Sequence, residues 1–144
     1  MSIKIRIVNP PPVANNDTAT TDFDSTVTIP VLNNDSDPSG NGLSILSINQ
    51  SSTQGTVTQS GSDLIYDPNN AFDSLPAGGS NTDSFGYTVK DSFNQTDSAT
   101  VTVTVEKPAL TPGLDGSFDV SSEDSGPSGV AFNDTGSRMF VVGQ

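Results

Sequence analysis

The sequence predicts an all-β protein, and three observations indicate it. Apolar residues alternate with polar ones in short stretches such as Ser84–Lys90 and Ala99–Val105, as in half-buried strands. The 144 residues include 13 Gly and 10 Pro, which favour turns between such strands. Of the 17 acidic residues, 15 are Asp, which favours turns and caps, whereas helix surfaces favour Glu. No stretch keeps a helical period.

Residues 1–12 are predicted to form an N-terminal strand arm and a proline linker. Ile3, Ile5 and Ile7 alternate with Lys4 and Arg6, and the three prolines at 10–12 impose an extended connector. Such an arm is suited to pairing, through residues 3–8, with a neighbouring molecule in a multimeric assembly. An ordinary first strand or a frayed terminus fits the same pattern.

Residues 13–106 are predicted to form one β-sandwich. After a polar stretch over 13–25, the expected strands are Thr26–Leu32, Leu43–Ile48, Gly55–Thr58, Leu64–Tyr66, Ser84–Lys90 and Ala99–Val105. Pro30 indicates an edge strand or a bulge, because proline cannot donate to a ladder. About seven short strands separated by turn residues are typical of an Ig-like sandwich.

A linker over residues 107–116 and a second, incomplete pattern over 117–144 follow. Phe118–Val120, Gly129–Phe132 and Met139–Val142 are expected strands, and Asn133–Gly136 is an expected hairpin turn. The chain should therefore end in a partial β hairpin.

Composition excludes several functions. The chain has no Cys and no His, which excludes disulfides, thiolate or imidazole metal sites and histidine catalysis. It also has no Trp. Its net charge of −12 would repel nucleic acid and anionic membranes, and no segment has the length of a membrane span. The N-terminus lacks the unbroken apolar run of a signal peptide. We expect no enzymatic activity.

The segment Val31–Pro38 carries the clearest candidate site. A strand-like run leads into Asn33, Asn34, Asp35, Ser36 and Asp37, so a strand ends in a turn rich in oxygen ligands. Two carboxylates two residues apart can converge on a hard cation such as Ca²⁺. The alternative is a turn in which these side chains bond their own backbone.

Residues 11–105 resemble the bacterial cadherin-like, Ig-type repeats of surface adhesins. The matching segments are Pro11–Asp17, Thr28–Pro38, Leu43–Ile45, Gly55–Val57, Tyr66–Asn69, Asp83–Asp91 and Ala99–Val105. The resemblance implies a Greek-key sandwich whose Asp-rich loops often hold Ca²⁺, with Asp17, Asp35, Asp37 and Asp91 as candidate ligands and Asp22 and Asp24 as weaker ones. The chain departs from these repeats at Pro38–Gly42, which lacks acidic residues, and at Ser92–Asn94, where glycine is usual. Fewer carboxylates imply weaker calcium binding, or none.

The C-terminal segment is similar to the opening of one β-propeller blade. The matching residues are Pro127–Gly136 and Met139–Gly143. One blade cannot close a ring, so the resemblance implies that further residues follow and that they could bind a cell-surface glycan.

These observations predict a non-catalytic structural or adhesive module. We expect part of a phage virion, as an appendage, fibre or decoration protein; the alternative is a calcium-binding repeat of a bacterial surface adhesin, so the expected location is a virion or a cell surface. A carbohydrate-binding module using Tyr66, Phe72 and Tyr87 is a further alternative. Glycoside hydrolysis by Asp67 with Asp83 or Asp91 is the least favoured, because any Asp-rich chain offers such pairs.

Overall fold

The structure, a computed structural model, describes residues 8–110 and the two short strands at 129–132 and 138–141. The chain forms two compact units, residues 1–109 and 110–144, which are described here one at a time. The predicted strand Phe118–Val120, the predicted turn Asn133–Gly136 and residues 1–7 of the N-terminal arm lie outside the described residues.

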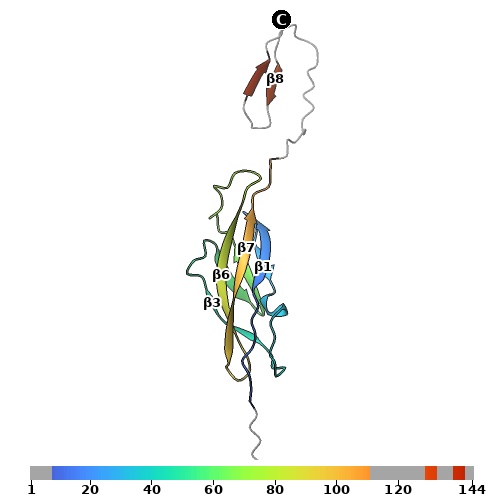
Figure 1. Ribbon diagram of the computed structural model, residues 1–144. Coiled ribbons are helices and arrows are strands. Elements are labelled where there is room, and N and C mark those ends of the chain that lie inside the picture. The colour runs from blue at the N-terminus through green and yellow to red at the C-terminus, as the bar shows by residue number, and fades with distance from the viewer. Residues whose placement is uncertain (1–7, 111–128, 133–137, 142–144) are drawn as a thin grey trace, which may run out of the picture. The chain divides into compact units, whose positions relative to one another are not determined.

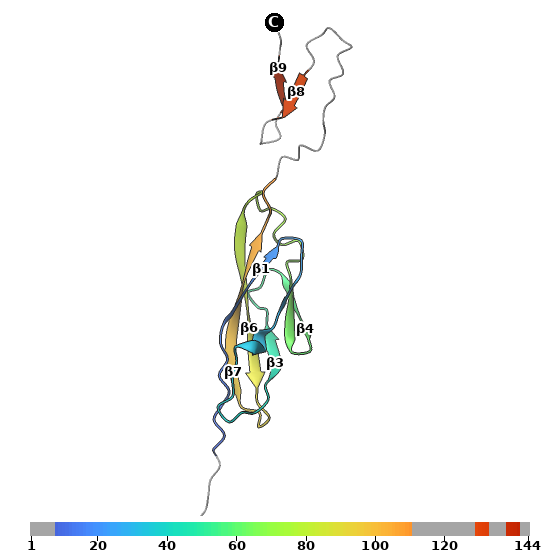
Figure 2. The same ribbon diagram turned by 90° about the vertical axis from the view of Figure 1, so that its right-hand side faces the viewer.

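Two β-sheets make up the first unit (Figures 1 and 2). The strands are β1 (Asp17–Asp22), β2 (Val27–Ile29), β3 (Ser44–Asn49), β4 (Thr56–Ser60), β5 (Asp63–Asp67), β6 (Ser80–Lys90) and β7 (Thr96–Glu106). One sheet has the order β1-β7-β6-β3 and the other has the order β2-β5-β4. This arrangement confirms the predicted all-β, Ig-like sandwich.

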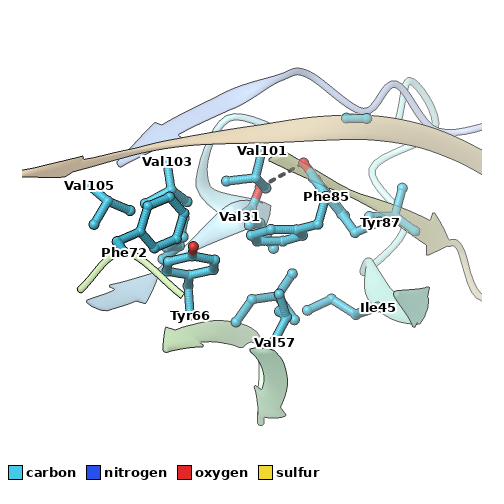
Figure 3. Close-up of a cluster of buried hydrophobic side chains, with 14 residues drawn as sticks. Val31, Ile45, Val57, Tyr66, Phe72, Phe85, Tyr87, Val101, Val103 and Val105 are labelled. Carbon is cyan, nitrogen blue, oxygen red and sulfur yellow. Dashed lines mark hydrogen bonds between the residues drawn. The ribbon is translucent and has the colours of Figure 1, made fainter. Parts of the chain in front are cut away.

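The hydrophobic core lies between the two sheets (Figure 3). Alternation along β6 and β7 turns every second residue inward, so that their apolar side chains face β4 and β5. Tyr66 of β5 stacks on Phe85 of β6 with a centroid distance of 6.2 Å. The buried apolar residues are Ile29, Val31, Ile45, Val57, Leu64, Tyr66, Phe72, Phe85, Tyr87, Val89, Ala99, Val101, Val103 and Val105.

Strand β1 was not predicted from the sequence. It pairs in parallel with β7, with Asp17 opposite Val101 and Asp22 opposite Glu106. Its inner positions hold Ala19 and Thr21, one small and one polar, so β1 lacks the apolar alternation of the other strands. Pairing with the long strand β7 therefore decides that these residues form a strand, although their own sequence does not predict one.

Pro30 ends the first strand of the smaller sheet. The predicted strand Thr26–Leu32 is shorter in the structure, because β2 stops at Ile29 and a 3-10 turn, η1 (Val31–Asn33), follows. Strand β2 lies at the edge of its sheet, which confirms the expectation from proline. In the described part of the chain, no helix is long and apolar enough to cross a membrane.

The second unit contains an antiparallel pair. Strands β8 (Gly129–Phe132) and β9 (Arg138–Val141) pair with Gly129 opposite Val141. This pairing confirms the predicted hairpin strands, with the second strand starting and ending one residue earlier than expected. A hairpin is common to many β folds, so the resemblance to a propeller blade stays a prediction.

Candidate functional site

One end of the sandwich gathers most of the predicted ligands, and we call it the loop end. It is formed by residues 9–17, by the segment 31–41, and by the end of β6 with the turn that follows it. The segment 31–41 folds over this end because Pro30 cannot continue β2. Val13 and Ser36 then hold the two segments together through paired backbone hydrogen bonds of 2.8 and 3.0 Å.

The hydroxyl of Tyr87 lies at the centre of the first polar cluster. Its oxygen is 3.0 Å from the carbonyl of Asn15, 3.0 Å from Asp17 Oδ2 and 3.2 Å from the carbonyl of Val31. The two carboxylate oxygens of Asp35 lie 3.1 and 3.2 Å away. Figure 3 shows the bond from Tyr87 to the carbonyl of Val31. A phenol carries one hydrogen, so it can satisfy only one of these five oxygens.

This excess of acceptors perturbs the titration of the cluster. Burial raises the pKa of Asp17 and the negative charge of Asp35 adds to the rise, while the Tyr87 hydrogen bond opposes it. Burial and the two neighbouring carboxylates raise the pKa of Tyr87, so the phenol keeps its proton. The cluster therefore favours an added proton or a cation over two bare carboxylates.

A second polar cluster lies beside the first and involves Asp37 and Asp91. Asn41 Nδ2 donates to Asp37 Oδ1 at 3.2 Å and to Asn9 Oδ1 at 2.7 Å, and Asn9 Nδ2 donates to Asp91 Oδ2 at 2.5 Å. Asp37 Oδ1 also accepts backbone N–H bonds from Ser39 and Asn41. Asp37 Oδ2 is buried and has no hydrogen-bond partner among the described residues. This cluster thus also has an acceptor that the described part of the chain leaves unsatisfied.

Asp91 differs from Asp37 in being well supplied with donors. It is 3 % exposed, and its Oδ1 accepts the backbone N–H groups of Phe93 and Gln95 at 2.9 and 2.8 Å. Burial acts to raise the pKa of Asp91, but the bonds from Gln95, Asn9 and Phe93 outweigh it and lower the pKa. The Asp91 carboxylate therefore shapes the turn after β6 in its charged form.

The structure divides the four predicted ligands into two pairs. Asp17 meets Asp35 at Tyr87, and Asp37 connects to Asp91 through Asn9 and Asn41, so Asp35 and Asp37 have different partners. Asp22 and Asp24, the weaker candidates, lie at the far end of β1 and in the turn after it. Among the described residues, no group of three or more acidic side chains is placed to hold a metal ion.

Several contributors to the loop end were missed by sequence reasoning. On the sequence alone, Tyr87 is named only as a candidate sugar-binding ring, and the position of its hydroxyl depends on the three-dimensional fold. The amides of Asn9 and Asn41 and the carbonyls of Asn15 and Val31 carry no chemical signal in the sequence. The apolar alternation of β6 was the available hint, since it orients Tyr87 inward.

A separate buried carboxylate, Asp83, holds the loop before β4. It is 4 % exposed and accepts the Tyr66 hydroxyl at 2.7 Å. It also accepts the backbone N–H groups of Gln54 and Gly55, each at 2.9 Å, and of Ser84 at 2.8 Å. A side chain at Gly55 would come within 2.7 Å of the Tyr66 ring, so glycine permits this close approach. Asp83 is thus occupied in fixing a loop.

The structure argues against the carbohydrate alternatives in the sandwich. Tyr66, Phe72 and Tyr87 are buried in the core, so their rings are not available to stack on a sugar. Of the nominated hydrolytic pair, Asp67 accepts the backbone N–H of Asn69 in a turn, and Asp83 and Asp91 are engaged as described. These rings therefore belong to the core, and the sugar-binding alternative finds no support in them.

The comparison with family models agrees with this architecture. A family model described as bacterial Ig domain matches residues 9–104. A search of curated proteins finds no match. A solved structure, titled as a nucleoside hydrolase-related hypothetical protein from Saccharophagus degradans associated with carbohydrate metabolism, is 20 % identical with a TM-score of 0.40. That similarity covers 69 % of this chain and 26 % of the other. The family match spans both sheets of the sandwich, and the chain therefore belongs to the bacterial Ig domain family.

Proposed function

We propose that this chain is a non-catalytic structural and adhesive module of an extracellular assembly, and that Ca²⁺ completes its loop end. The observation that carries the calcium proposal is the set of five oxygens around the single proton of Tyr87. Membership of a family that is typically non-catalytic and lies at the cell surface supports the structural role. The engagement of Asp83 and Asp91 in holding loops supports it as well.

The chemistry of the loop end matches a hard cation. Two carboxylates and two backbone carbonyls converge on Tyr87, and these are the oxygen types that Ca²⁺ binds. Asp35 lies close enough to Asp17 for its negative charge to raise the pKa of Asp17. A cation would offset that repulsion. In the second cluster, Asp37 Oδ2 has no partner among the described residues and is a further candidate ligand.

The ligand count predicts weak binding. Each cluster holds two carboxylates, and tight calcium sites use more charge. We therefore expect a dissociation constant of about 0.1–1 mM, as in extracellular calcium modules. Such a site fills in a calcium-rich medium and empties when calcium is removed.

Thermal unfolding tests the calcium proposal. With a dissociation constant of about 1 mM, about 10 mM Ca²⁺ stabilises the folded state by about 1.4 kcal/mol relative to EDTA. That corresponds to a rise of about 5–10 °C in the midpoint for a domain of this size. A double variant, Asp17→Asn with Asp35→Asn, should lose most of the rise.

The control must separate a site from general screening, because the chain carries a net charge of −12. Asp73→Asn with Glu106→Gln makes the same change in charge at exposed positions that are not candidate ligands and should keep the calcium response. An equal midpoint in Ca²⁺ and EDTA, or an equal response of both double variants, would leave Asp35 and Asp37 as turn formers.

The assembly we propose is a phage virion appendage, fibre or decoration protein, in which residues 3–8 pair with a neighbouring subunit. The alternating sequence of that segment supports this choice. The second candidate is a repeat of a bacterial surface adhesin, which the bacterial Ig family favours. Antibody raised against residues 9–104 should label purified virions; labelling of uninfected cells and not of virions would establish the adhesin instead.

A further inference from the structure

The chain crosses the sandwich from one end to the other. It enters at the loop end, where Asn9 bonds Asp91, and it leaves beyond Glu106 at the end of β7 (Figure 1). The first strand β1 and the last strand β7 are direct neighbours and run in parallel, with six consecutive residues of β1 in register from Asp17 to Asp22. The two ends of the unit are therefore connected across one ladder.

This geometry determines how a pull on the two ends is resisted. Pulling residue 8 and residue 108 apart draws β1 and β7 in opposite directions along their common axis. Hydrogen bonds in a ladder lie across the strands, so this pull loads all of them together and in shear. A ladder opened from one end instead loses its bonds one at a time.

Further contacts attach the segment before β1 to β7 and to the turn that precedes β7, and they resist the same pull. Asp97 Oδ2 accepts the N–H of Ala14 at 2.9 Å, Asn16 Oδ1 accepts the N–H of Thr100 at 2.9 Å, and Gln95 Nε2 donates to the carbonyl of Asn9. Pro10, Pro11 and Pro12 cannot donate to a ladder, and side chains provide these attachments before and after them. A pull on residue 8 meets these bonds before it reaches β1.

The far end of the pair is anchored as well. Phe23 donates its N–H to the carbonyl of Glu106 at 2.8 Å, and Lys107 exchanges backbone bonds of 2.8 Å with Gly78 and Gly79. Strand β7 lies between β1 and β6, and its inner residues Val101, Val103 and Val105 are buried. Release of the edge strand β1 is thus the step that a pull must force first.

We infer that the sandwich bears tension along its strands, with the parallel β1–β7 ladder as the element that resists forced unfolding. This inference rests on the proposed role as a structural link, and it goes further by naming the mechanical function and the residues that perform it. Tension would reach the domain whenever the two parts that it joins are pulled apart.

Single-molecule pulling along two axes tests the inference. The chain contains no Cys, so introduced pairs define the points of attachment. Val8→Cys with Pro108→Cys loads the ladder in shear, and Val8 is 73 % exposed. Asp24→Cys with Pro108→Cys attaches both handles at the same end of the ladder, because Phe23 bonds Glu106, and opens it one bond at a time. All measurements are made on the full chain in EDTA.

We expect the first axis to require at least twice the unfolding force of the second, although both proteins melt at the same temperature. Pro11→Cys, also at an exposed residue, replaces Val8→Cys if that variant does not fold. Equal forces, or a lower force along the first axis, would overturn the inference. The outcome does not depend on calcium or on which assembly contains the chain, so failure here is distinct from failure of the proposed function.

Discussion

The carboxylate of Asp83 gives the sharpest prediction about what holds the sandwich together. Asp83→Ala removes the acceptor for the Tyr66 hydroxyl and for the N–H groups of Gln54, Gly55 and Ser84. Tyr66 is fully buried, so its hydroxyl would find no water in exchange. The loop before β4 would lose these attachments to β6 and keep the bond from the Thr53 hydroxyl to the carbonyl of Ser84.

The size of the loss follows from the donors left behind. A buried donor without a partner costs about 1–3 kcal/mol, and bonds to a charged group are at the high end. Gln54 is exposed and can bond water, whereas the Tyr66 hydroxyl and the half-buried Gly55 N–H have less access to it. We therefore expect Asp83→Ala to lower the free energy of unfolding by about 3–5 kcal/mol. That is a large part of the 5–15 kcal/mol typical of a domain.

Urea unfolding followed by circular dichroism measures this loss. Asp73→Ala removes an exposed carboxylate and should change the free energy by less than about 0.5 kcal/mol. Tyr66→Phe removes one of the four donors and should cost about 1.5–3 kcal/mol, which keeps the test informative if Asp83→Ala does not fold. The reasoning is refuted if Asp83→Ala is no more harmful than Asp73→Ala.

Two further predictions concern the cluster at Tyr87 and the core. Because the pKa of Asp17 is raised in the folded state, ionising this group costs stability as the pH rises above the unfolded value of 3.8. In EDTA, Asp17→Asn should remove that loss, so the free energy of unfolding of the wild type should fall relative to the variant between about pH 4 and 7; parallel pH profiles would contradict this. Val103→Ala in β7 should cost about 2–3 kcal/mol in urea unfolding through lost burial and a cavity, since Val103 is fully buried. Thr102→Ala, at the exposed position beside it, should cost less than about 1 kcal/mol, and equal losses at the two positions would argue against the assigned inner face of β7.

The fold could be predicted where the burial of every second residue makes apolar and polar residues alternate in the sequence. Strands β6 and β7 turn Phe85, Tyr87, Val101 and Val103 into the core, and their alternation identified both strands. Strand β1 left no such trace, because Ala19 and Thr21 face inward and pairing with β7 decides its conformation.

The candidate site was predictable only in its parts. The acidic turn identified Asp35 and Asp37, and the resemblance added Asp17 and Asp91. The sequence did not indicate that Asp35 and Asp37 have different partners, because that depends on how the segment 31–41 folds over β1 and β6. Tyr87 brings together the members of the first cluster and Asn9 those of the second, each from a position far along the chain, and such contacts have no local signal.

Hydrogen exchange of backbone amides, measured with and without Ca²⁺, tests the central claim most directly. The account predicts slower exchange with Ca²⁺ in the loop end, at residues 13–17 and 31–41, and no change in β4 and β5, which lie outside both clusters. Uniform exchange under the two conditions, or slowing confined to β4 and β5, would contradict the proposal that a cation completes the loop end of this sandwich.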